Sequence, residues 1–210
     1  MLSLLLLLLP LKPLRLQLSN SAYLVVGLGN PGPGYSANRH NVGQMVLDVL
    51  AKRVGVSFKS HKSNSVIAET RLGVGGPKVI LAKPLSFMNT SGGPVANLAK
   101  FFDVAVGHII VVHDELDISV HDVRIKDGGG HAGHNGLRDI ISAIGTQGFV
   151  RVRVGIGRPH GQADVADFVL KDFSSTEKKE LDLTLETAAD AIEAILVDGL
   201  IKAQQKYHSA

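Results

Sequence analysis

The feature that most constrains the fold of this chain is an alternation of short apolar runs with longer segments whose apolar residues recur every three or four positions. Short apolar runs are typical of buried strands, and the longer spacing is typical of amphipathic helices. The expected strands cover residues 23–26, 66–72, 78–83, 109–113 and 150–156, and the expected helices cover residues 41–54, 94–102, 137–144 and 181–195. Strands that alternate with helices predict an α/β fold.

Two local signals refine this prediction. The glycine turn Gly73-Val74-Gly75-Gly76 joins two expected strands and predicts an antiparallel pair, which makes the sheet mixed. The segment Ser174-Ser175-Thr176-Glu177 has the capping-box pattern and predicts the start of the last helix. No internal repeat and no linker is evident, so we expect one domain over residues 22–210.

Composition excludes several classes of protein. Apolar residues make up 45% and charged residues 20% of the 210 positions, which argues against a disordered or collagen-like chain. The absence of cysteine excludes a disulfide framework, a cysteine-containing zinc site and a thiol nucleophile. The formal charge is +3, and Lys12 and Arg15 carry two of these charges, so basicity is weak evidence for a polyanionic partner.

The amino-terminal segment contains six consecutive leucines at positions 4–9, interrupted afterwards by Pro10 and Pro13. A membrane span needs about 20 apolar residues, and a secretory signal needs basic residues before its apolar segment and a small-residue cleavage site after it. Neither pattern is present. We expect residues 1–21 to form a poorly ordered leucine-rich extension, and a peripheral membrane contact is the alternative.

The loop Gly27-Leu28-Gly29-Asn30-Pro31-Gly32 follows the first expected strand and matches the G-x-G-x-x-G pattern of dinucleotide sites. Such a site needs a loop that opens directly into a helix, but Pro33-Gly34 follow and predict a long irregular loop. The ribose-binding acid is also missing, because Asp48 lies within an expected helix. A nucleotide-dependent oxidoreductase is therefore disfavoured. A plain strand-to-loop turn is the structural alternative, although Asn30 lies where α/β sheets usually place their sites.

Polar side chains recur beside glycines or after apolar strands in four further segments. These segments are Arg39-His40-Asn41, Phe87-Met88-Asn89, His113-Asp114-Glu115 and the glycine-rich stretch 128–136. Each has a structural explanation by itself: His40 as a residue at a helix start, Asn89 as a turn former, and Asp114 as a cap. Their joint occurrence at strand ends predicts a functional site.

The residue types in these segments limit the chemistry. Covalent acyl transfer lacks its usual nucleophile, since the chain has no cysteine and no serine in a G-x-S-x-G elbow. A histidine beside a carboxylate can instead deprotonate water, and asparagine amides can donate hydrogen bonds to a developing oxyanion. The candidates for these parts are His40, Asp114, Asn30, Asn89 and Asn135.

Metal-dependent hydrolysis is the competing chemistry. His131 and His134 are three residues apart, and the carboxylates of residues 114, 115 and 117 lie upstream with His113. A glycine-rich loop is a poor rigid frame for metal ligands, so this alternative is disfavoured.

Six motifs occur in a fixed order between residues 27 and 157. They are Gly27-Leu28-Gly29-Asn30-Pro31-Gly32, Tyr35 with Arg39-His40-Asn41-Val42-Gly43, Phe87-Met88-Asn89-Thr90-Ser91-Gly92, His113-Asp114-Glu115-Leu116-Asp117, the stretch from Gly128 to Leu137, and Arg151-Val152-Arg153-Val154-Gly155-Ile156-Gly157. Together they resemble the bacterial-type peptidyl-tRNA hydrolase family. The resemblance covers essentially all of the chain from Tyr23 onward.

The resemblance implies hydrolysis of the ester between a peptide and the terminal ribose of tRNA, which recycles tRNA from aborted translation. It implies that His40 is the general base, that Asp114 orients it, and that Asn30 and Asn89 position the water and the peptide carbonyl. It further implies that Asn135 binds the substrate near the scissile ester. The family fold implied is a single-domain, mixed, mostly parallel twisted sheet with helices on both faces.

The resemblance also implies a pocket shaped by Tyr35, Phe87 and Met88, with no metal, nucleotide or organic cofactor. The expected enzyme is a cytoplasmic monomer without a stable protein partner or membrane contact, and peptidyl-tRNA is its substrate. Lys126 and Arg153 fall where the family is thought to grip tRNA phosphates. Weaker candidates for phosphate contacts are Arg124, Arg138 and Arg158.

The chain departs from the family pattern at several positions. Asn38 stands where a threonine is usual, Glu115 replaces an aspartate, and His121 occupies the place of a turn glycine. Asp127 lies beside Lys126 and would partly offset its field. The alternative function is a non-catalytic RNA-binding or splicing-factor relative on the same fold. Retention of His40, together with Asp114 and the asparagines, favours the enzyme.

Overall fold

The computed structural model describes residues 22–72, 76–159, 161 and 164–208. The leucine-rich extension predicted for residues 1–21 lies outside the described residues, as do residues 73–75 of the glycine turn. Among the described helices, none combines the length and the apolar character that crossing a membrane requires.

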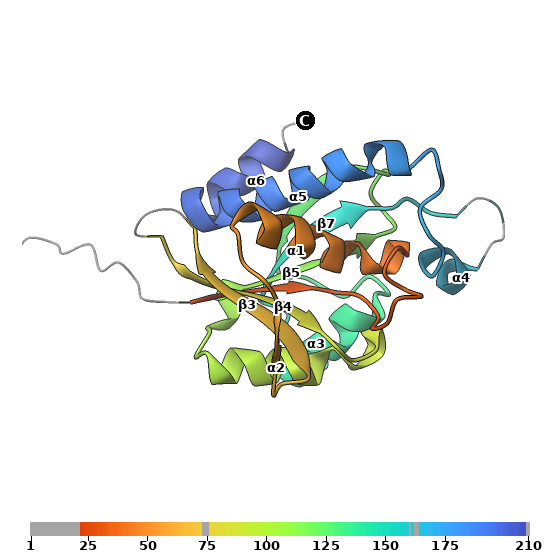
Figure 1. Cartoon of the computed structure of the whole chain (residues 1–210). Helices are drawn as coiled ribbons and strands as arrows, with labels where there is room; N and C mark the ends of the chain where they lie inside the picture. The colour runs from red at the N-terminus through yellow and green to blue at the C-terminus, as the bar shows by residue number, and fades with distance from the viewer. Residues whose placement is uncertain (1–21, 73–75, 160, 162–163, 209–210) are drawn as a thin grey trace, which may run out of the picture.

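A single twisted sheet forms the centre of the molecule (Figure 1). Within the described residues its seven strands lie in the order β2-β3-β4-β1-β5-β7-β6. The strands are β1 (Tyr23–Gly27), β2 (Lys59–His61), β3 (Ser65–Arg71), β4 (Lys78–Pro84), β5 (Ile109–Glu115), β6 (Val123–Asp127) and β7 (Val150–Gly155). The four central strands β4, β1, β5 and β7 are parallel, and β3 and β6 run against them on either side.

Helices cover both faces of the sheet (Figure 1). The α-helices are α1 (Val42–Arg53), α2 (Gly92–Phe101), α3 (Asn135–Ile144), α4 (Val165–Val169), α5 (Lys178–Asp198) and α6 (Leu200–His208), and short 3-10 turns lie at Arg39–Asn41, Met88–Thr90 and Val106–His108. Helices α1, α5 and α6 pack on one face, and α2 and α3 pack on the other. The α/β fold with a mixed sheet between two helical layers, predicted from the sequence, is confirmed.

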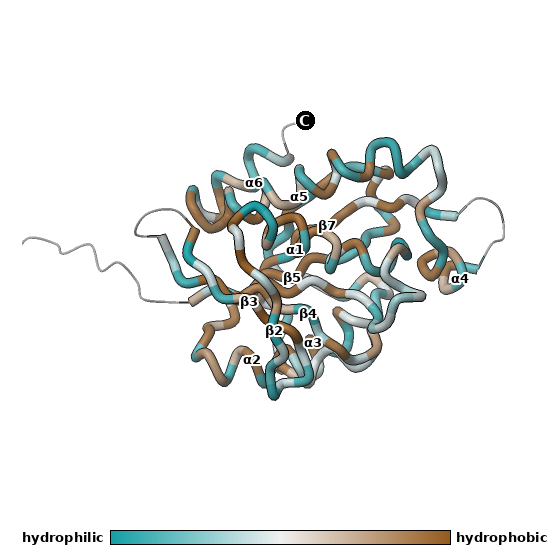
Figure 2. Tube along the Cα trace, viewed as in Figure 1, coloured by the Kyte–Doolittle hydropathy of each residue, from teal (hydrophilic) through white to brown (hydrophobic). Residues whose placement is uncertain are grey.

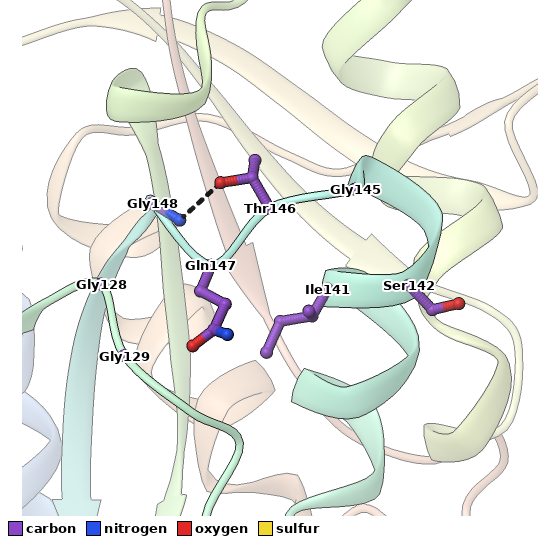
Figure 3. A pocket seen from close by; sticks show the side chains of 8 residues that line it. All are labelled: Gly128, Gly129, Ile141, Ser142, Gly145, Thr146, Gln147 and Gly148. Carbon is purple, nitrogen blue, oxygen red and sulfur yellow. Dashed lines mark hydrogen bonds between the residues drawn. The ribbon is translucent and has the colours of Figure 1, made fainter.

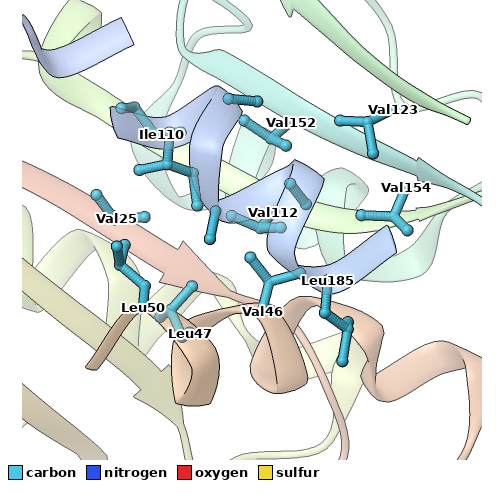
Figure 4. Close-up of a cluster of buried hydrophobic side chains, with 14 of the residues drawn as sticks. Val25, Val46, Leu47, Leu50, Ile110, Val112, Val123, Val152, Val154 and Leu185 are labelled. Carbon is cyan, nitrogen blue, oxygen red and sulfur yellow. The ribbon is translucent and has the colours of Figure 1, made fainter. Parts of the chain in front are cut away.

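The buried strands explain why their sequences read as continuous apolar runs. Val25 of β1 faces α1 and α5, whereas Leu24 and Val26 face α2 and α3, and all three side chains are fully buried. Both faces of such a strand must therefore be apolar. One hydrophobic core therefore lies on each face of the sheet. Figure 4 shows the core on the side of α1 and α5, where Leu47 and Leu50 of α1 meet the strands. In Figure 2 the hydrophobic residues accordingly gather between the layers.

Two local predictions are also confirmed. Strands β3 and β4 pair antiparallel. The capping box forms, because the Ser174 N–H donates to Glu177 Oε2 at 2.7 Å and the Glu177 N–H donates to Ser174 Oγ at 3.2 Å. Most expected bounds differ from the observed ones by one to three residues. Strand β5 continues to Glu115, so the two residues expected just after it are its last two residues.

Candidate active site

The carboxyl ends of β1, β4 and β5 lie at one edge of the sheet, where a cavity of about 620 Å³ opens. The loop after β1 brings Asn30 to this cavity, the segment after β4 brings Asn89, and the end of β5 brings Asp114. The loop after β1 does not open into an α-helix, since the 3-10 turn at Arg39–Asn41 precedes α1. This arrangement agrees with the irregular loop predicted from its prolines.

Two glycines bring this turn close to the end of β5. A Cβ atom at Gly43, the second residue of α1, would overlap the carbonyl oxygen of Val112, and one at Gly27 would overlap the carbonyl oxygen of Gly43. Only glycine permits such a close approach of backbones. Helix α1 therefore begins directly against β1 and β5, which places His40 beside Asp114.

His40 and Asp114 form the central pair of the site. His40 Nδ1 lies 2.9 Å from Asp114 Oδ1 and 3.0 Å from Oδ2, and the two side chains are 11% and 3% exposed. Burial lowers the pKa of His40, but the adjacent Asp114 carboxylate outweighs burial and raises this pKa above 6.5. An ionised carboxylate only accepts, so Nδ1 carries the proton and Nε2 holds the free lone pair.

Asp114 has a second imidazole partner. His134 Nε2 lies 3.0 Å from Asp114 Oδ1. Burial alone would raise the pKa of Asp114, but His40 and His134 outweigh it and hold this pKa well below the usual range for aspartate. The sequence offered His134 only as a metal-ligand candidate, because histidine is not among the residues that usually cap helices.

Asn30 is held rigidly at the cavity wall. Its Oδ1 accepts from the Met88 N–H at 2.8 Å, which leaves its Nδ2 amide free to donate. Asn41 clamps its backbone, since Asn41 Oδ1 accepts from the Asn30 N–H and Asn41 Nδ2 donates to the Asn30 carbonyl, both at 2.9 Å. This clamping role of Asn41 was not predicted from the sequence, because it joins residues on two different loops.

The remaining residues predicted to shape the site fall in two groups. Asn89, Asn135, Phe87 and Met88 line the cavity, and Asn135 Oδ1 accepts from Arg138 Nη1 at 3.2 Å. Tyr35 does not line it; its ring meets the edge of Phe87, with centroids 6.3 Å apart. The apolar wall, for which the sequence gave no signal, includes α4 and consists of Val165, Ala166, Val169 and Leu170.

The residues before His40 anchor the turn to a distant segment. Arg39 is buried and pairs with Glu177 at 2.6 Å, and its Nη1 donates to the carbonyls of Lys171 and Asp172 at 3.2 and 2.7 Å. Asn38, a departure from the family pattern, donates its side-chain amide to Asp172 Oδ1 at 2.7 Å. The turn that carries His40 is thus fixed from both the sheet and the segment before α5.

Comparison with known proteins identifies the family to which the chain belongs. The family model for peptidyl-tRNA hydrolase matches residues 24–210. The chain belongs to the peptidyl-tRNA hydrolase family. The resemblance stated from the sequence motifs is therefore confirmed.

Relatives and solved structures of this family agree closely with the chain. A peptidyl-tRNA hydrolase from an Arthrobacter species is 61% identical over 188 residues, which cover 90% of this chain and 97% of the relative. One from Renibacterium salmoninarum is 57% identical over 192 residues, covering 91% and 99%. A crystal structure of peptidyl-tRNA hydrolase from Acinetobacter baumannii is 37% identical, covers 90% of this chain and 95% of that one, and superposes with a TM-score of 0.82.

The two main basic candidates for phosphate contacts lie outside the cavity, whereas the weaker candidate Arg158 lines it. Lys126 and Arg153 line a separate hollow of about 480 Å³ beside β6 and β7. Arg153 is already paired with Glu115, with Nη2 2.9 Å and Nε 3.0 Å from Oε2. Lys126 is exposed and has no ion-pair partner among the described residues. Asp127 is exposed beside it.

The other basic candidates are also paired or lie apart from this hollow. Arg124 contacts Asp122 at 3.5 Å, Arg158 contacts Asp117 at 2.6 Å, and Arg138 bonds to Asn135. His121 keeps a left-handed backbone with φ of 73°, although it stands in place of a glycine. Its Nδ1 lies 2.8 Å from Thr184 Oγ1, whose hydroxyl donates to the Glu180 carbonyl, so His121 donates to Thr184 and ties its turn to α5.

A further hollow lies at the carboxyl end of α3 (Figure 3). Its volume is about 580 Å³, and half of its described lining residues are glycines, the others being Ile141, Ser142, Thr146 and Gln147. The Thr146 hydroxyl accepts from the Gly148 N–H at 3.2 Å. None of these lining residues can act as an acid or base near neutral pH, so this hollow lacks the groups for hydrolysis.

Among the described residues, the group that could hold a metal ion consists of His40, Asp114 and His134, whose ligand atoms lie within 4.8 Å of one another. His134 Nδ1 accepts from the N–H groups of Gly136 and Leu137 at 3.1 and 3.3 Å. A neutral imidazole that accepts at Nδ1 carries its proton on Nε2. The nitrogen that faces Asp114 therefore has no lone pair for a metal, and the hydrogen-bonded arrangement does not fit a metal site.

Proposed function

We propose that this protein hydrolyses the ester bond between the peptide and the terminal ribose of peptidyl-tRNA, using a water molecule activated by His40. The observation that carries the proposal is the buried His40–Asp114 pair at 2.9 Å, which leaves Nε2 of a cavity-lining imidazole as a free proton acceptor. Membership of the peptidyl-tRNA hydrolase family supports the substrate class. We assign this activity to one catalytic domain over residues 22–210.

In the first step, His40 Nε2 takes a proton from water while the water oxygen attacks the ester carbonyl. The positive charge that forms on the imidazole is stabilised by Asp114, which stays ionised. A base whose pKa lies near the working pH combines adequate proton affinity with a sufficient deprotonated fraction. The Asp114 carboxylate raises the pKa of His40 above its ordinary value and so increases the affinity of Nε2 for the proton.

The tetrahedral intermediate carries a negative charge on the former carbonyl oxygen. Asn30 can donate its free Nδ2 amide to this oxygen or to the water, and Asn89 and Asn135 line the same cavity. Neutral amides stabilise the oxyanion without adding a competing charge. We assign Asn30 and Asn89 to the water and the carbonyl, and Asn135 to the substrate near the ester.

In the second step, the carbon–oxygen bond to the ribose breaks, and protonated His40 returns its proton to the leaving ribose oxygen. Ester and water thereby give a carboxylic acid and a free ribose hydroxyl, and His40 recovers its starting state. The reaction written in this way requires neither a metal nor an organic cofactor. The substrate's peptide would lie along Phe87, Met88 and the apolar α4 wall, and Tyr35 would support Phe87.

We assign the tRNA phosphates chiefly to Lys126, because it is exposed and free of an ion-pair partner among the described residues. Arg153 contributes less net charge, since Glu115 already neutralises it. Phosphate contacts carry no base information, which suits an enzyme that accepts many tRNAs. We further propose that the enzyme acts in the cytoplasm as a monomer.

Hydrolysis of an N-blocked aminoacyl-tRNA in the presence of a chelator tests the proposed function. We expect the wild-type protein to release the blocked amino acid, and His40→Ala to lose this activity while its circular dichroism spectrum is unchanged. Tight tRNA binding without turnover by the wild-type protein would instead support a non-catalytic RNA-binding protein. Turnover retained in His40→Ala would remove the base assignment.

A charge reversal tests the phosphate contact. Lys126→Glu should weaken tRNA binding at least tenfold and make it less sensitive to salt, because one phosphate contact is lost. It should leave cleavage of a tRNA-free ester substrate nearly unchanged. Lys52→Glu, at an exposed position of α1, makes the same change in net charge away from the hollow and should have little effect. Equal effects of the two variants would refute the assignment.

A further inference from the structure

The carboxylate of Asp114 lies between two imidazoles that contact it through different ring nitrogens. His40 approaches through Nδ1 and His134 through Nε2, at 2.9 and 3.0 Å from the same oxygen. We propose that His134 is a positioning residue for the hydrolysis: it fixes Asp114 in the orientation that serves His40. This proposal rests on the proposed function and adds a second imidazole to it.

The helix that follows His134 determines which of its nitrogens carries the proton. His134 occupies the N-cap of α3, and its Nδ1 accepts from the backbone N–H groups of Gly136 and Leu137. These amides can only donate, so Nδ1 must stay unprotonated while the cap is intact. The single proton then lies on Nε2 and points at Asp114. The backbone of α3 thus makes His134 a permanent donor to the carboxylate.

Packing keeps this imidazole in place. The His134 side chain is 8% exposed, and its ring meets the edge of His113 at a centroid distance of 4.9 Å. His113 is itself fixed, because its Nδ1 donates to the Asp114 carbonyl at 2.7 Å. On the other side, the His134 ring lies 5.0 Å from the ring of His40. The cavity-facing charged groups near this cluster are Glu115 and Arg158.

Two consequences follow for the reaction. A donor on Oδ1 prevents the carboxyl group from turning, so both oxygens stay within 3.0 Å of His40 Nδ1. The same donor spreads the negative charge of Asp114 over two partners, which limits how strongly it attracts the proton of His40. His134 should therefore raise the rate through orientation and limit how far Asp114 raises the pKa of His40.

The variant His134→Asn separates these roles from simple helix capping. Asparagine is a good N-cap and can still accept from the α3 amides, but its short side chain cannot replace the donor at Asp114. We expect kcat at pH 7 to fall about tenfold or more, with KM changed less than twofold. The acid limb of the kcat profile should move to higher pH. The melting temperature should stay close to that of the wild type.

The matched control is His131→Asn, three residues earlier in the same loop. His131 Nδ1 accepts from the Gly133 N–H at 3.0 Å, an interaction that asparagine can also make, and it does not contact Asp114. We expect normal kcat and a normal pH profile for this variant. Wild-type kcat and an unmoved acid limb in His134→Asn would overturn the proposal.

A direct measurement covers the case in which His134→Asn fails to fold. Nitrogen-15 NMR of the wild-type imidazoles should show His134 protonated on Nε2, and His40 and His113 protonated on Nδ1. A His134 ring protonated on Nδ1 would refute the proposal. Failure of the wild-type protein to cleave N-blocked aminoacyl-tRNA would overturn the proposed function instead, and it would leave these tautomers unaffected.

Discussion

A buried carboxylate with an abnormally low pKa is the main electrostatic feature of the site. Burial opposes the charge of Asp114, yet the imidazoles of His40 and His134 more than offset this cost. In return, Asp114 raises the pKa of His40 against the effect of burial on that ring. The strength of the base and the charge of its partner are therefore coupled, and a change in either must appear in the pH dependence of catalysis.

Replacement of Asp114 by asparagine tests this coupling. Catalysis needs neutral His40, so the acid limb of the wild-type kcat/KM profile should lie above pH 6.5, because the His40 pKa is raised. Asp114→Asn removes the group that raises it, so the limb should move to lower pH. The rate on the plateau should fall about 100-fold or more, because the imidazole loses its orienting anion. A limb that stays in place would show that another group sets the His40 pKa.

Asn30 offers a test of oxyanion stabilisation with little change in shape. In Asn30→Asp, a carboxylate oxygen can still accept from the Met88 N–H, but the amide donor is lost. We expect kcat to fall about 100-fold while the melting temperature changes little. Steady-state kinetics and thermal unfolding measure the two effects. A normal kcat would assign oxyanion stabilisation to other donors.

At the scale of elements, the entry of α1 decides where the base lies. The close approach at Gly43 depends on a missing side chain, whereas Gly93, also the second residue of its helix, has no atoms near its Cβ position. The two glycines are thus the same residue at the same position of a helix, but they differ in how closely other atoms pack against them. This difference provides a matched pair of substitutions.

Gly43→Ala should force α1 away from β1 and β5. We expect the free energy of unfolding to fall by about 1–3 kcal/mol, and kcat to fall by more than tenfold, because His40 moves relative to Asp114. Gly93→Ala should be neutral or stabilise the protein by up to about 1 kcal/mol, since alanine is the better helix former. Urea unfolding and steady-state kinetics measure both. Equal effects of the two variants would mean that close packing at Gly43 does not place the base.

Sequence patterns predicted the elements whose signal is local. The capping box before α5 and the apolar run of β5 are examples. The prediction ended β5 two residues early, because charged residues at its carboxyl end broke the apolar run although they are buried in the structure. The short edge strand β2 has no apolar run at all, so its pairing with β3 could not be predicted.

At the scale of the whole molecule, His113 should make the free energy of unfolding depend on pH. Complete burial, followed by the influence of His134, lowers the pKa of His113 to about 3. An unfolded chain binds a proton at this residue near pH 6.5, so its contribution to stability is present above that pH and is lost as the pH falls toward 3. His40, whose pKa is raised, acts in the opposite sense.

A comparison of variants isolates this contribution. His113→Asn keeps a donor near the Asp114 carbonyl but cannot titrate. Between pH 6 and pH 4, urea unfolding should show that the wild type loses about 1.4 kcal/mol more per pH unit than the variant. Identical pH dependence in the two proteins would show that His113 is protonated in the folded state.

The sequence predicted which residues form the candidate site and at which strand ends they lie, but not the contacts that hold them in place. His40, Asp114, Asn30 and Asn89 come together at one edge of the sheet, where the topology of parallel strands directs them. The clamp of Asn41 on Asn30 and the pairing of Arg153 with Glu115 depend on tertiary contacts that no local pattern encodes. The family resemblance suggested Arg153 as a phosphate contact, and its ion pair with Glu115 could not be foreseen from the sequence.

The anchoring of Arg39 by Asp172 and Glu177 has a consequence for how the enzyme comes into being. These partners lie more than 130 residues later in the chain. The turn that carries His40 therefore cannot be fixed until the carboxyl-terminal part has been synthesised and packs against it. A chain that ended before Asp172 would contain every residue assigned to the chemistry and still lack the support that holds its base. The contacts that support His40 can thus form only after the chain has been synthesised as far as Glu177.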